Sequence, residues 1–358
     1  MDFDKIDIYG THYKKYIAIV AVLFLACLFI AFIYPGVQEG IDLRGGTLLI
    51  VRSDTLIDAD SLEAALNAQF PLADVRISSI SSPTGGAGTI IEFAENTELG
   101  TADKQLKSAK ELLASDPAAA SAQAIAIMNS LSAYVPVPPT TNLEPEQILT
   151  LANDTLAKAK EVFEVRLQEF IRTEFSLGNE VAFQKREVGP VLGETFYASA
   201  LTVGIIGFIL VTIVIFAFFR EFIPSVAVIA AAIFDISFAL AAMAIFGIAL
   251  SLSSIPALLM LIGYSVDTDI MLTTRLLKRR EGSPKSRAMN SMKTGLTMTF
   301  TTLAALTAML VLSYFGQILI VFEISAVLLF GLIGDLISTW LMNAPVLLWY
   351  AEKKEVHA

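Results

Sequence analysis

Residues 250–277, LSLSSIPALLMLIGYSVDTDIMLTTRLL, decide the fold of this chain because they are apolar over the length of a membrane-spanning helix yet contain two aspartates. A helix rises about 1.5 Å per residue, so roughly 20 residues cross a hydrocarbon layer about 30 Å thick. A carboxylate inside such a helix costs roughly 2.5–3.5 kcal/mol even on lenient scales. We therefore expect Asp267 and Asp269 to mark the functional site.

The composition of the whole chain indicates an integral membrane protein. Its 358 residues are 55% hydrophobic and its mean hydropathy is +0.65, which is too apolar for an ordinary soluble domain. The single cysteine, Cys27, excludes an intramolecular disulfide. Six apolar blocks of spanning length predict six transmembrane helices: Tyr16–Tyr34, Phe196–Phe219, Phe222–Phe246, Leu250–Leu277, Thr294–Tyr314 and Ile318–Tyr350.

The distribution of lysine and arginine predicts the orientation of these helices. Basic residues cluster at 278–293 and also occur before the first block, at Arg220 and at the C-terminus, and such segments stay on the cytoplasmic side. The first block is too long for a signal peptide and is followed by no cleavage site, so we expect a retained anchor. We predict a multi-pass protein of the cell membrane with these parts: a cytoplasmic N-terminus 1–15, helix 16–34, an external domain 35–195, the remaining helices within 196–350 with a basic cytoplasmic loop 278–293, and a cytoplasmic C-terminus 351–358.

The external segment 35–195 contains an alternating order of predicted strands and helices. Strands are expected at 46–52, 74–81, 89–94 and 180–188, with a turn at 83–88 and helices at 61–70 and 102–113. The order β-α-β-β-α-β is that of a ferredoxin-like α+β domain. A helical insertion at about 117–174 precedes the last strand and is either a lever or partner surface, or a variable elaboration. The segment carries 23 acidic and 12 basic residues, and this negative charge excludes nucleic acid as a partner.

Two further aspartates, Asp235 and Asp335, lie near the middle of their apolar blocks. Buried carboxyl groups and close like charges favour the protonated form, so the four aspartates predict a proton relay. Residues two apart on a helix are rotated by about 200°, so Asp267 and Asp269 point to different neighbours. The position of Asp267 nearer the middle of the block predicts that it is the more buried of the two. Thr297 and Thr301 share a helix face and are candidates to support the carboxyls, or to bond only their own backbone.

The alternative for each aspartate is a protonated group that bonds a neighbouring helix and stabilises packing by about 0.6 kcal/mol. Gly263 with Tyr264, and Gly331 with Gly334, are expected to allow close helix packing. The sequence contains no phosphate-binding loop, and its two histidines, His12 and His357, lie near the termini without a cysteine cluster. These observations predict no enzyme activity, no cofactor and no metal site.

Three motifs, each placed at a consistent position relative to a predicted span, resemble the SecD/SecF family of accessory subunits of the Sec protein-export machinery. They are Gly40-Ile-Asp42-Leu-Arg-Gly45-Gly46, Val188-Gly189-Pro190-Val-Leu-Gly193 and Gly263-Tyr264-Ser265. The single external domain is typical of the SecF branch. The sequence Val-Asp-Thr-Asp after Ser265 is most similar to the archaeal form of that branch. The family belongs to the resistance-nodulation-division (RND) superfamily of six-helix units.

The resemblance implies a SecD-like partner subunit, the Sec translocon, an unfolded exported polypeptide and the surrounding membrane lipid as partners, and coupling of export to the proton gradient. Bacterial members have an aspartate at the position of Thr268, so the resemblance leaves open which of Asp267 and Asp269 carries the proton. They also have an arginine near the start of the fifth span, where Lys293 is the nearest cation here. Two other functions stay possible at this stage: an RND-type proton-driven exporter of small hydrophobic molecules, and a scaffold that transports nothing.

Overall fold

The computed structural model of this protein describes residues 9, 14–53, 57–81, 87–94, 96–178, 181–188, 190–278, 282–316 and 318–356. Gly189, the turn residues 83–86 and both histidines lie outside this range, as do most of the predicted N-terminal segment 1–15, residues 279–281 of the basic loop and the last two residues. The chain forms two compact units. Residues 1–43 with 192–358 make the helical unit, and residues 44–191 make the sheet unit.

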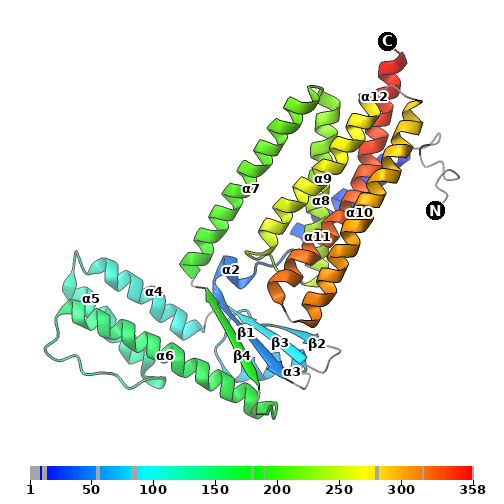
Figure 1. Cartoon of the computed structure of the whole chain (residues 1–358). Coiled ribbons are helices and arrows are strands. Elements are labelled where there is room, and N and C mark those ends of the chain that lie inside the picture. The colour runs from blue at the N-terminus through cyan, green and yellow to red at the C-terminus, as the bar shows by residue number, and fades with distance from the viewer. Residues whose placement is uncertain are drawn as a thin grey trace. The chain divides into compact units, whose positions relative to one another are not determined.

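The helical unit contains six helices that are long and apolar enough to cross a membrane, among the described residues. They are α1(Lys14–Phe32), α7(Pro190–Phe219), α8(Phe222–Phe246), α9(Ser254–Leu277), α10(Pro284–Phe315) and a last span in which α11(Leu319–Ser338) continues through the π-helical turn η3(Thr339–Asn343) into α12(Ala344–Val356) (Figure 1). The short helix α2(Ile41–Arg44) follows α1. The six predicted spans are therefore present.

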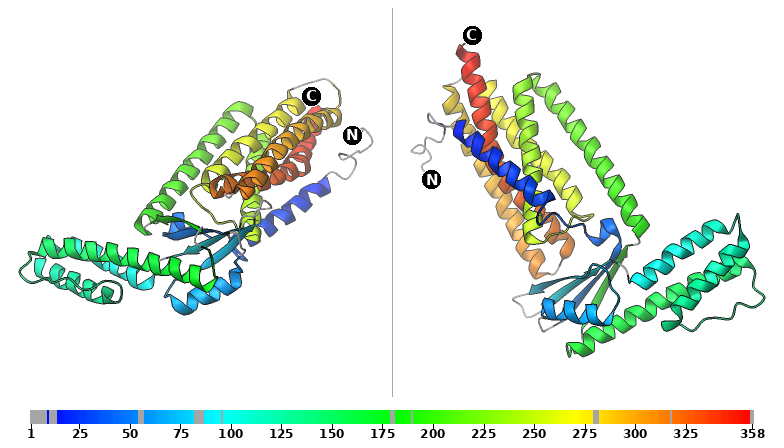
Figure 2. Two further views of the ribbon diagram at one scale, coloured as in Figure 1. Left: turned by 60° about the horizontal axis from the view of Figure 1, so that its bottom comes forward. Right: turned by 180° about the vertical axis from the view of Figure 1, so that it is seen from behind.

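The spans differ in the share of their residues that is buried inside the unit. Of the α8 span 61% is buried, whereas only 6% of the α7 span is, and α7 inclines away from α8 and α9 in Figure 1 and in the right panel of Figure 2. Glycines allow the central helices to approach closely: a Cβ at Gly331 would lie 2.3 Å from a methyl group of Leu261, and one at Gly334 would lie 3.0 Å from the Phe238 Cβ. The predicted close packing at these two glycines is confirmed. The same prediction for Gly263 and Tyr264 is wrong within this chain, because both are exposed and a Cβ at Gly263 would meet no atom within 4 Å.

The outward surface of the helical unit is rich in large apolar side chains. In α1 and α7 the half-exposed or exposed residues include Val22, Leu25, Phe29, Val203, Ile205, Leu210 and Val214. A contiguous apolar surface of this kind needs a cover other than water. Lipid around a transmembrane bundle provides that cover.

The start of α10 differs from the prediction. We expected a basic loop at 278–293 and a helix from Thr294, but the helix begins at Pro284. The Ser283 side chain accepts a hydrogen bond from the Ser286 backbone N–H, and Pro284 occupies the first turn, which is a strong helix start. Most of the basic segment is therefore the polar first part of α10, because the cap sets the start of a helix before its apolar run begins.

The sheet unit is built from β1(Gly46–Ser53), α3(Ala59–Gln69), β2(Arg76–Ser81), β3(Ala87–Phe93), α4(Thr97–Leu112), α5(Pro117–Ser130), the short 3₁₀ turn η2(Leu131–Ala133), α6(Pro145–Glu174) and β4(Ala182–Val188). All strand pairs are antiparallel, and the strand order is β2-β3-β1-β4. The predicted order of strands and helices is present. Leu49, Val51, Ile91 and Phe93 alternate onto one face of the sheet and form a core with α3, α4 and α6.

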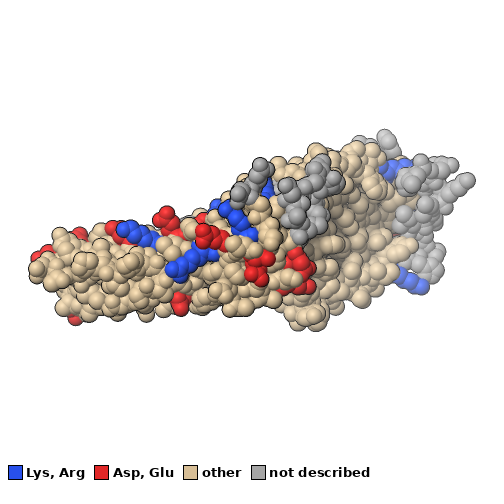
Figure 3. All heavy atoms as spheres, turned by 90° about the horizontal axis from the view of Figure 1, so that it is seen from below, with Lys and Arg blue, Asp and Glu red and all other residues tan. Residues whose placement is uncertain are grey.

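The insertion within the sheet unit is a packed group of helices. The predicted insertion at about 117–174 contains α5 and α6, which lie side by side with α4 and extend beyond the sheet (Figure 2). Alanines at 120, 124, 152 and 159 are fully buried between them, so the helices approach closely. Lysine, arginine, aspartate and glutamate side chains are interspersed on the face seen in Figure 3, so the acidic excess makes no single-sign patch on that face.

Candidate functional site

Three carboxyl groups meet inside the helical unit. Asp235 comes from α8, Asp269 from α9 and Asp335 from α11, and all three residues are 0% exposed. Within the described part of the chain, none of them forms an ion pair with a lysine or arginine. The site therefore buries three acidic groups whose partners are neutral.

Hydroxyl and amide groups supply the hydrogen bonds to these carboxyls. Asp235 accepts from the hydroxyls of Ser265 and Ser338, at 2.5 and 2.6 Å. Asp269 accepts from the Asn343 amide nitrogen at 2.6 Å, which fixes the side chain of Asn343 against α9. The donors come from the central helix α9 and from the last span.

Thr339 connects the second and third carboxyl groups. Its hydroxyl oxygen lies 3.0 Å from Asp269 Oδ1 and 3.1 Å from Asp335 Oδ1, so these two oxygens are at most about 6 Å apart. A hydroxyl has one hydrogen and can donate to only one acceptor at a time. Both contacts are hydrogen bonds only when one of the carboxyls is protonated and donates to the threonine oxygen. The geometry fits one shared proton between Asp269 and Asp335.

Electrostatic repulsion also favours one protonated carboxyl in this pair. Two unit negative charges about 6 Å apart repel by roughly 3 kcal/mol at an effective dielectric constant of about 20. Four buried oxygens around the pair have no hydrogen-bond partner among the described residues: Asp269 Oδ2, Asp335 Oδ2, Asn343 Oδ1 and Thr273 Oγ1. A proton on a carboxyl oxygen, or an ordered water between these atoms, would use them. The unpaired oxygens therefore leave room for a proton on either carboxyl of the pair.

The π-helical turn orients two of these donors. Ala344 N–H bonds to the Thr339 carbonyl, five residues back, in place of the Trp340 carbonyl four residues back. The Trp340 carbonyl instead accepts a hydrogen bond of 3.1 Å from the buried Tyr9 hydroxyl. Thr339 and Asn343 consequently face the same carboxylate, and π-helical turns of this kind are often found at functional sites.

The prediction that Asp267 is the more buried member of its pair is wrong. Asp269 is fully buried, whereas Asp267 is exposed on the surface of α9, and no hydrogen bond or ion pair to its carboxylate occurs among the described residues. The two side chains do point in different directions, as their rotation predicted. Thr268, between them, is buried and bonds the Tyr264 carbonyl of its own helix at 3.4 Å.

The supporting residues proposed on α10 do not reach the cluster. Thr297 and Thr301 are exposed, and their hydroxyls bond the backbone carbonyls of Lys293 and Met298 in their own helix. The alternative that these threonines bond only backbone is confirmed. Lys293 is half-buried, and among the described residues no ion pair joins it to the three buried aspartates. The donors are instead Ser265 of α9 and three residues of the last span, Ser338, Thr339 and Asn343.

The residues of the three family motifs lie in different parts of the structure. Gly45, just before β1, has φ +80°, and Gly46, the first residue of β1, has φ +143° with the Phe93 carbonyl oxygen 2.5 Å from where a Cβ would stand. A side chain would disturb both conformations. Gly263 and Tyr264 lie on the exposed face of α9 beside Asp267. Ser265 is fully buried and donates to Asp235. Pro190 and Gly193 lie in the first turns of α7.

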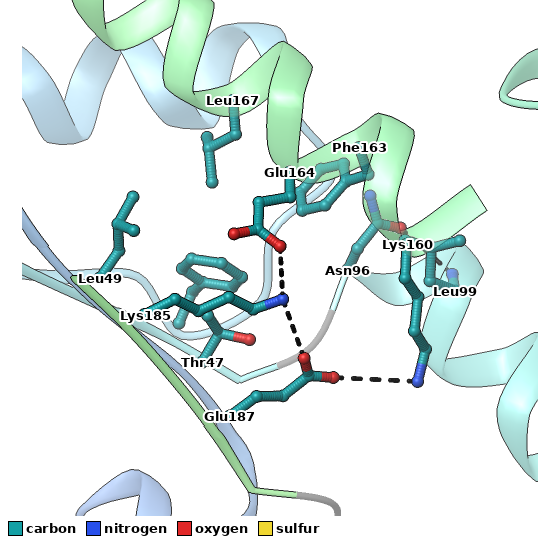
Figure 4. A pocket seen from close by; sticks show the side chains of 11 residues that line it. Thr47, Leu49, Asn96, Leu99, Lys160, Phe163, Glu164, Leu167, Lys185 and Glu187 are labelled. Atoms are coloured by element: carbon teal, nitrogen blue, oxygen red, sulfur yellow. Dashed lines mark hydrogen bonds and ion pairs between the residues drawn. The ribbon is translucent and has the colours of Figure 1, made fainter. Parts of the chain in front are cut away.

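The sheet unit has a second group of charges around a small pocket between the sheet and α6 (Figure 4). The Lys185 ammonium lies 2.7 Å from Glu164 and 3.0 Å from Glu187, and Lys160 lies 3.9 Å from Glu187 and 3.4 Å from Asp103. Partial burial alone would lower the pKa of Lys185, but the two glutamates outweigh it and raise that pKa. Partial burial would raise the pKa of Asp103, but Lys107 and Lys160 lower it.

Sequence reasoning missed Ser338, Thr339 and Asn343. A signal was available in an otherwise apolar block: Asp335, Thr339 and Asn343 recur every four residues, and Ser338 follows Asp335 by three. Such spacing places them on one helix face. Ser265 was noted only as part of a motif, although it lies one turn before Asp269.

Comparisons with known proteins agree on one family. The family "Protein export membrane protein SecD/SecF, C-terminal" matches residues 171–353. The protein-export membrane protein SecF of Methanothermobacter thermautotrophicus is 30% identical over 342 residues, which cover 95% of this chain and 93% of that protein. The proteins of that name from Methanolacinia petrolearia and Pyrococcus furiosus are 47% and 45% identical over 167 and 168 residues. These shorter matches cover 47% of this chain in each case, and 59% and 56% of the two relatives.

A solved structure shares the fold. The crystal structure of SecDF, a translocon-associated membrane protein from Thermus thermophilus, is similar with a TM-score of 0.61 at 18% sequence identity. The similarity covers 96% of this chain and 38% of that one. It therefore extends over both the helical unit and the sheet unit of this chain.

Proposed function

Because the chain belongs to the SecD/SecF family of protein-export membrane proteins, with its matched relatives among archaeal SecF proteins, we propose that it is an auxiliary subunit of the Sec protein translocase. It would act on an unfolded polypeptide that leaves the translocon, through the sheet unit as a ferredoxin-like external domain. Both termini would lie in the cytoplasm, as the basic flanks of the spans favour.

The buried carboxyl cluster is the observation that carries this proposal further, to proton coupling. Asp269 and Asp335 share the Thr339 hydroxyl, and Asp235 is bonded to the neighbouring Ser338. A proton that moves onto or off this cluster changes the charge at the contact of α8, α9 and the last span. Those helices would then repack, and their movement would drive the external domain.

Asp267 has a different role in this proposal. An exposed carboxylate halfway along a membrane span cannot face lipid at low cost, and a Cβ at the adjacent motif residue Gly263 would meet no atom within 4 Å in this chain. A helix of a SecD-like partner, with a cationic or hydrogen-bonding side chain opposite Asp267, would cover this face. The SecDF protein of similar fold, of which this chain matches 38%, supports such a partner.

The RND-type exporter of small hydrophobic molecules is not favoured, because the matched relatives are named as protein-export proteins. The scaffold reading predicts no role for the buried carboxyls. An export assay with the aspartates changed decides between the scaffold and the proposed function.

The test uses inverted membrane vesicles that contain the full chain and a SecD-like partner, with export measured with and without an imposed proton gradient. The Asp269→Asn variant should insert normally, but its gradient-dependent export should be reduced at least tenfold. Asp267→Leu should instead reduce co-purification of the partner. Unimpaired gradient-dependent export in the double variant Asp269→Asn, Asp335→Asn would overturn the relay.

A further inference from the structure

The segment that follows α1 is hydrogen-bonded to the turn that precedes α9. Gly40 N–H donates to the Leu250 carbonyl at 2.8 Å, and Leu250 N–H donates to the Gln38 carbonyl at 2.7 Å. We name residues 38–43 together with residues 250–254 the clasp. Its two halves are far apart in sequence, and both belong to the helical unit.

The clasp explains why the first family motif has glycine at position 40 and aspartate at position 42. Asp42 is 2% exposed, and its carboxylate accepts a hydrogen bond of 3.3 Å from Leu252 N–H. A Cβ at Gly40 would lie 3.1 Å from the Leu250 carbonyl oxygen and 3.5 Å from the Ala249 Cβ. The motif therefore contains one residue that is small enough for the backbones to meet and one that bonds the facing turn.

The same turn is also held from α11. The Glu323 carboxylate accepts hydrogen bonds from the hydroxyls of Ser251, at 2.6 Å, and Ser253. Asp269 is 15 residues, or about 22 Å, along α9 from Ser254, and Asp335 is 12 residues, or about 18 Å, along α11 from Glu323. The two helices whose carboxyls share Thr339 are thus joined again at the clasp.

The clasp leads directly into the sheet unit. The chain leaves the clasp at Leu43 and enters β1 at Gly46, so at most about 10 Å of extended chain separates them. The other covalent connection runs from β4 into α7, and α7 is the least buried span. A loosely packed helix moves independently of its neighbours and transmits their displacement poorly.

We propose that the clasp is a rigid link that transmits displacement of α9 and α11 to the sheet unit, with Gly40 and Asp42 as its positioning residues. The inference rests on the proposed function, because it assumes that protonation of the cluster moves these helices. When α9 shifts, residues 250–254 shift with its first turn, and residues 38–43 follow through their hydrogen bonds. The start of β1 is displaced in turn.

The test separates transmission from proton movement by measuring proton uptake and export in the same vesicles. Gly40→Val forces the two backbones apart, and we expect it to retain gradient-dependent proton uptake while export falls at least tenfold. Asp42→Ala should show the same split with a smaller fall. Gly204→Ala is the matched control, because a Cβ there meets no atom within 4 Å, and it should match the wild type in both measurements.

A disulfide staple tests rigidity directly. In a Cys27→Ala background, Glu39→Cys and Leu250→Cys join residues that are bridge partners. A link that stays closed should export normally when oxidised. Loss of export on oxidation, restored by a reductant, would overturn the proposal by showing that the clasp must open.

The outcomes also distinguish failure of this inference from failure of the proposed function. Normal export in Gly40→Val, together with no gradient-dependent export in Asp269→Asn, would overturn the clasp and leave the relay standing. Loss of proton uptake in a folded, inserted Gly40→Val protein would likewise overturn transmission, because the clasp would then act on the cluster itself. Normal export in both variants would overturn both proposals.

Discussion

Asp103, Glu164 and Glu187 of the sheet unit each lie within 4 Å of a lysine ammonium, whereas Asp235, Asp269 and Asp335 of the helical unit are bonded to hydroxyl and amide groups. The first group is partly exposed to water, and the second is fully buried. The same type of side chain is thus held in two opposite ways.

The difference shows what each arrangement is suited to do. An exposed carboxylate beside a lysine stays ionised over the neutral pH range, and such a pair contributes little more than about 1 kcal/mol to stability. A buried carboxylate without a cation is costly unless it is protonated. Of the two arrangements, the second is therefore the one whose charge depends on its surroundings, as the proposed coupling requires.

Removal of the Thr339 hydroxyl from the cluster is expected to have the largest effect on export. Thr339→Val keeps the shape of the side chain but deletes the only hydrogen that Asp269 and Asp335 share through Thr339. A hydrogen bond to a charged group contributes about 1.5–3 kcal/mol, and about 1.4 kcal/mol changes a rate tenfold. Gradient-dependent export should therefore fall at least tenfold.

Thr297→Val is the control for that variant, because its hydroxyl bonds only to its own helix backbone. It should stay within twofold of the wild type in the same vesicle assay. Equal activity of the two variants would contradict a role for the shared hydroxyl.

The boundaries of a span were predictable where charged residues or a glycine coincide with the ends of its apolar run. The predicted block 222–246 has the same bounds as α8, since Arg220 and Glu221 precede it and Gly247 ends it in a left-handed conformation, φ +67°. The start of α10 was missed because its first turns are polar. The order of strands and helices along the sheet unit followed from alternating apolar residues and turn signals.

The identity of the buried aspartate was not predictable from position along the span. Depth in the block favoured Asp267, but the packing of α9 against α8 and α11 decides which face is inside. Ser265, Asp269 and Leu272 follow one another at intervals of three and four and are all buried. Polar residues lie on the exposed face of α9, at Asp267, as well as on its buried face, so polarity alone did not identify the buried face and the neighbouring helices had to be known.

The ion pairs of the sheet unit should show a small effect on stability and none on coupling. A double-mutant cycle with Lys185→Met and Glu164→Gln should give an interaction free energy of about 0.5–1 kcal/mol. Amide hydrogen exchange of β4 in the full-length protein would measure it. The value should decrease in 1 M salt because exposed charges are screened, and export should stay within twofold of wild type. A tenfold export defect would show that these charges belong to the mechanism.

The smallest expected effect is the response of the sheet unit to pH. The lowered pKa of Asp103 means that its stabilisation is complete above the ordinary value of 3.8 and is lost as the pH falls through the lowered pKa. The raised pKa of Lys185 means that its stabilisation is complete below the ordinary value of 10.5 and is lost as the pH rises through the raised pKa. Neither changes between about pH 5 and 9.

Exchange protection of β4, corrected for intrinsic rates, should consequently be constant over that interval. Lys185→Met should keep the wild-type pH profile of export even though it weakens the network. A profile displaced by Lys185→Met would place a titrating step in the sheet unit and remove the contrast between the two groups of carboxylates. A profile displaced only by substitutions at Asp269, Asp335 or Thr339 would assign the step to the buried cluster, whose carboxyls have no lysine or arginine partner among the described residues.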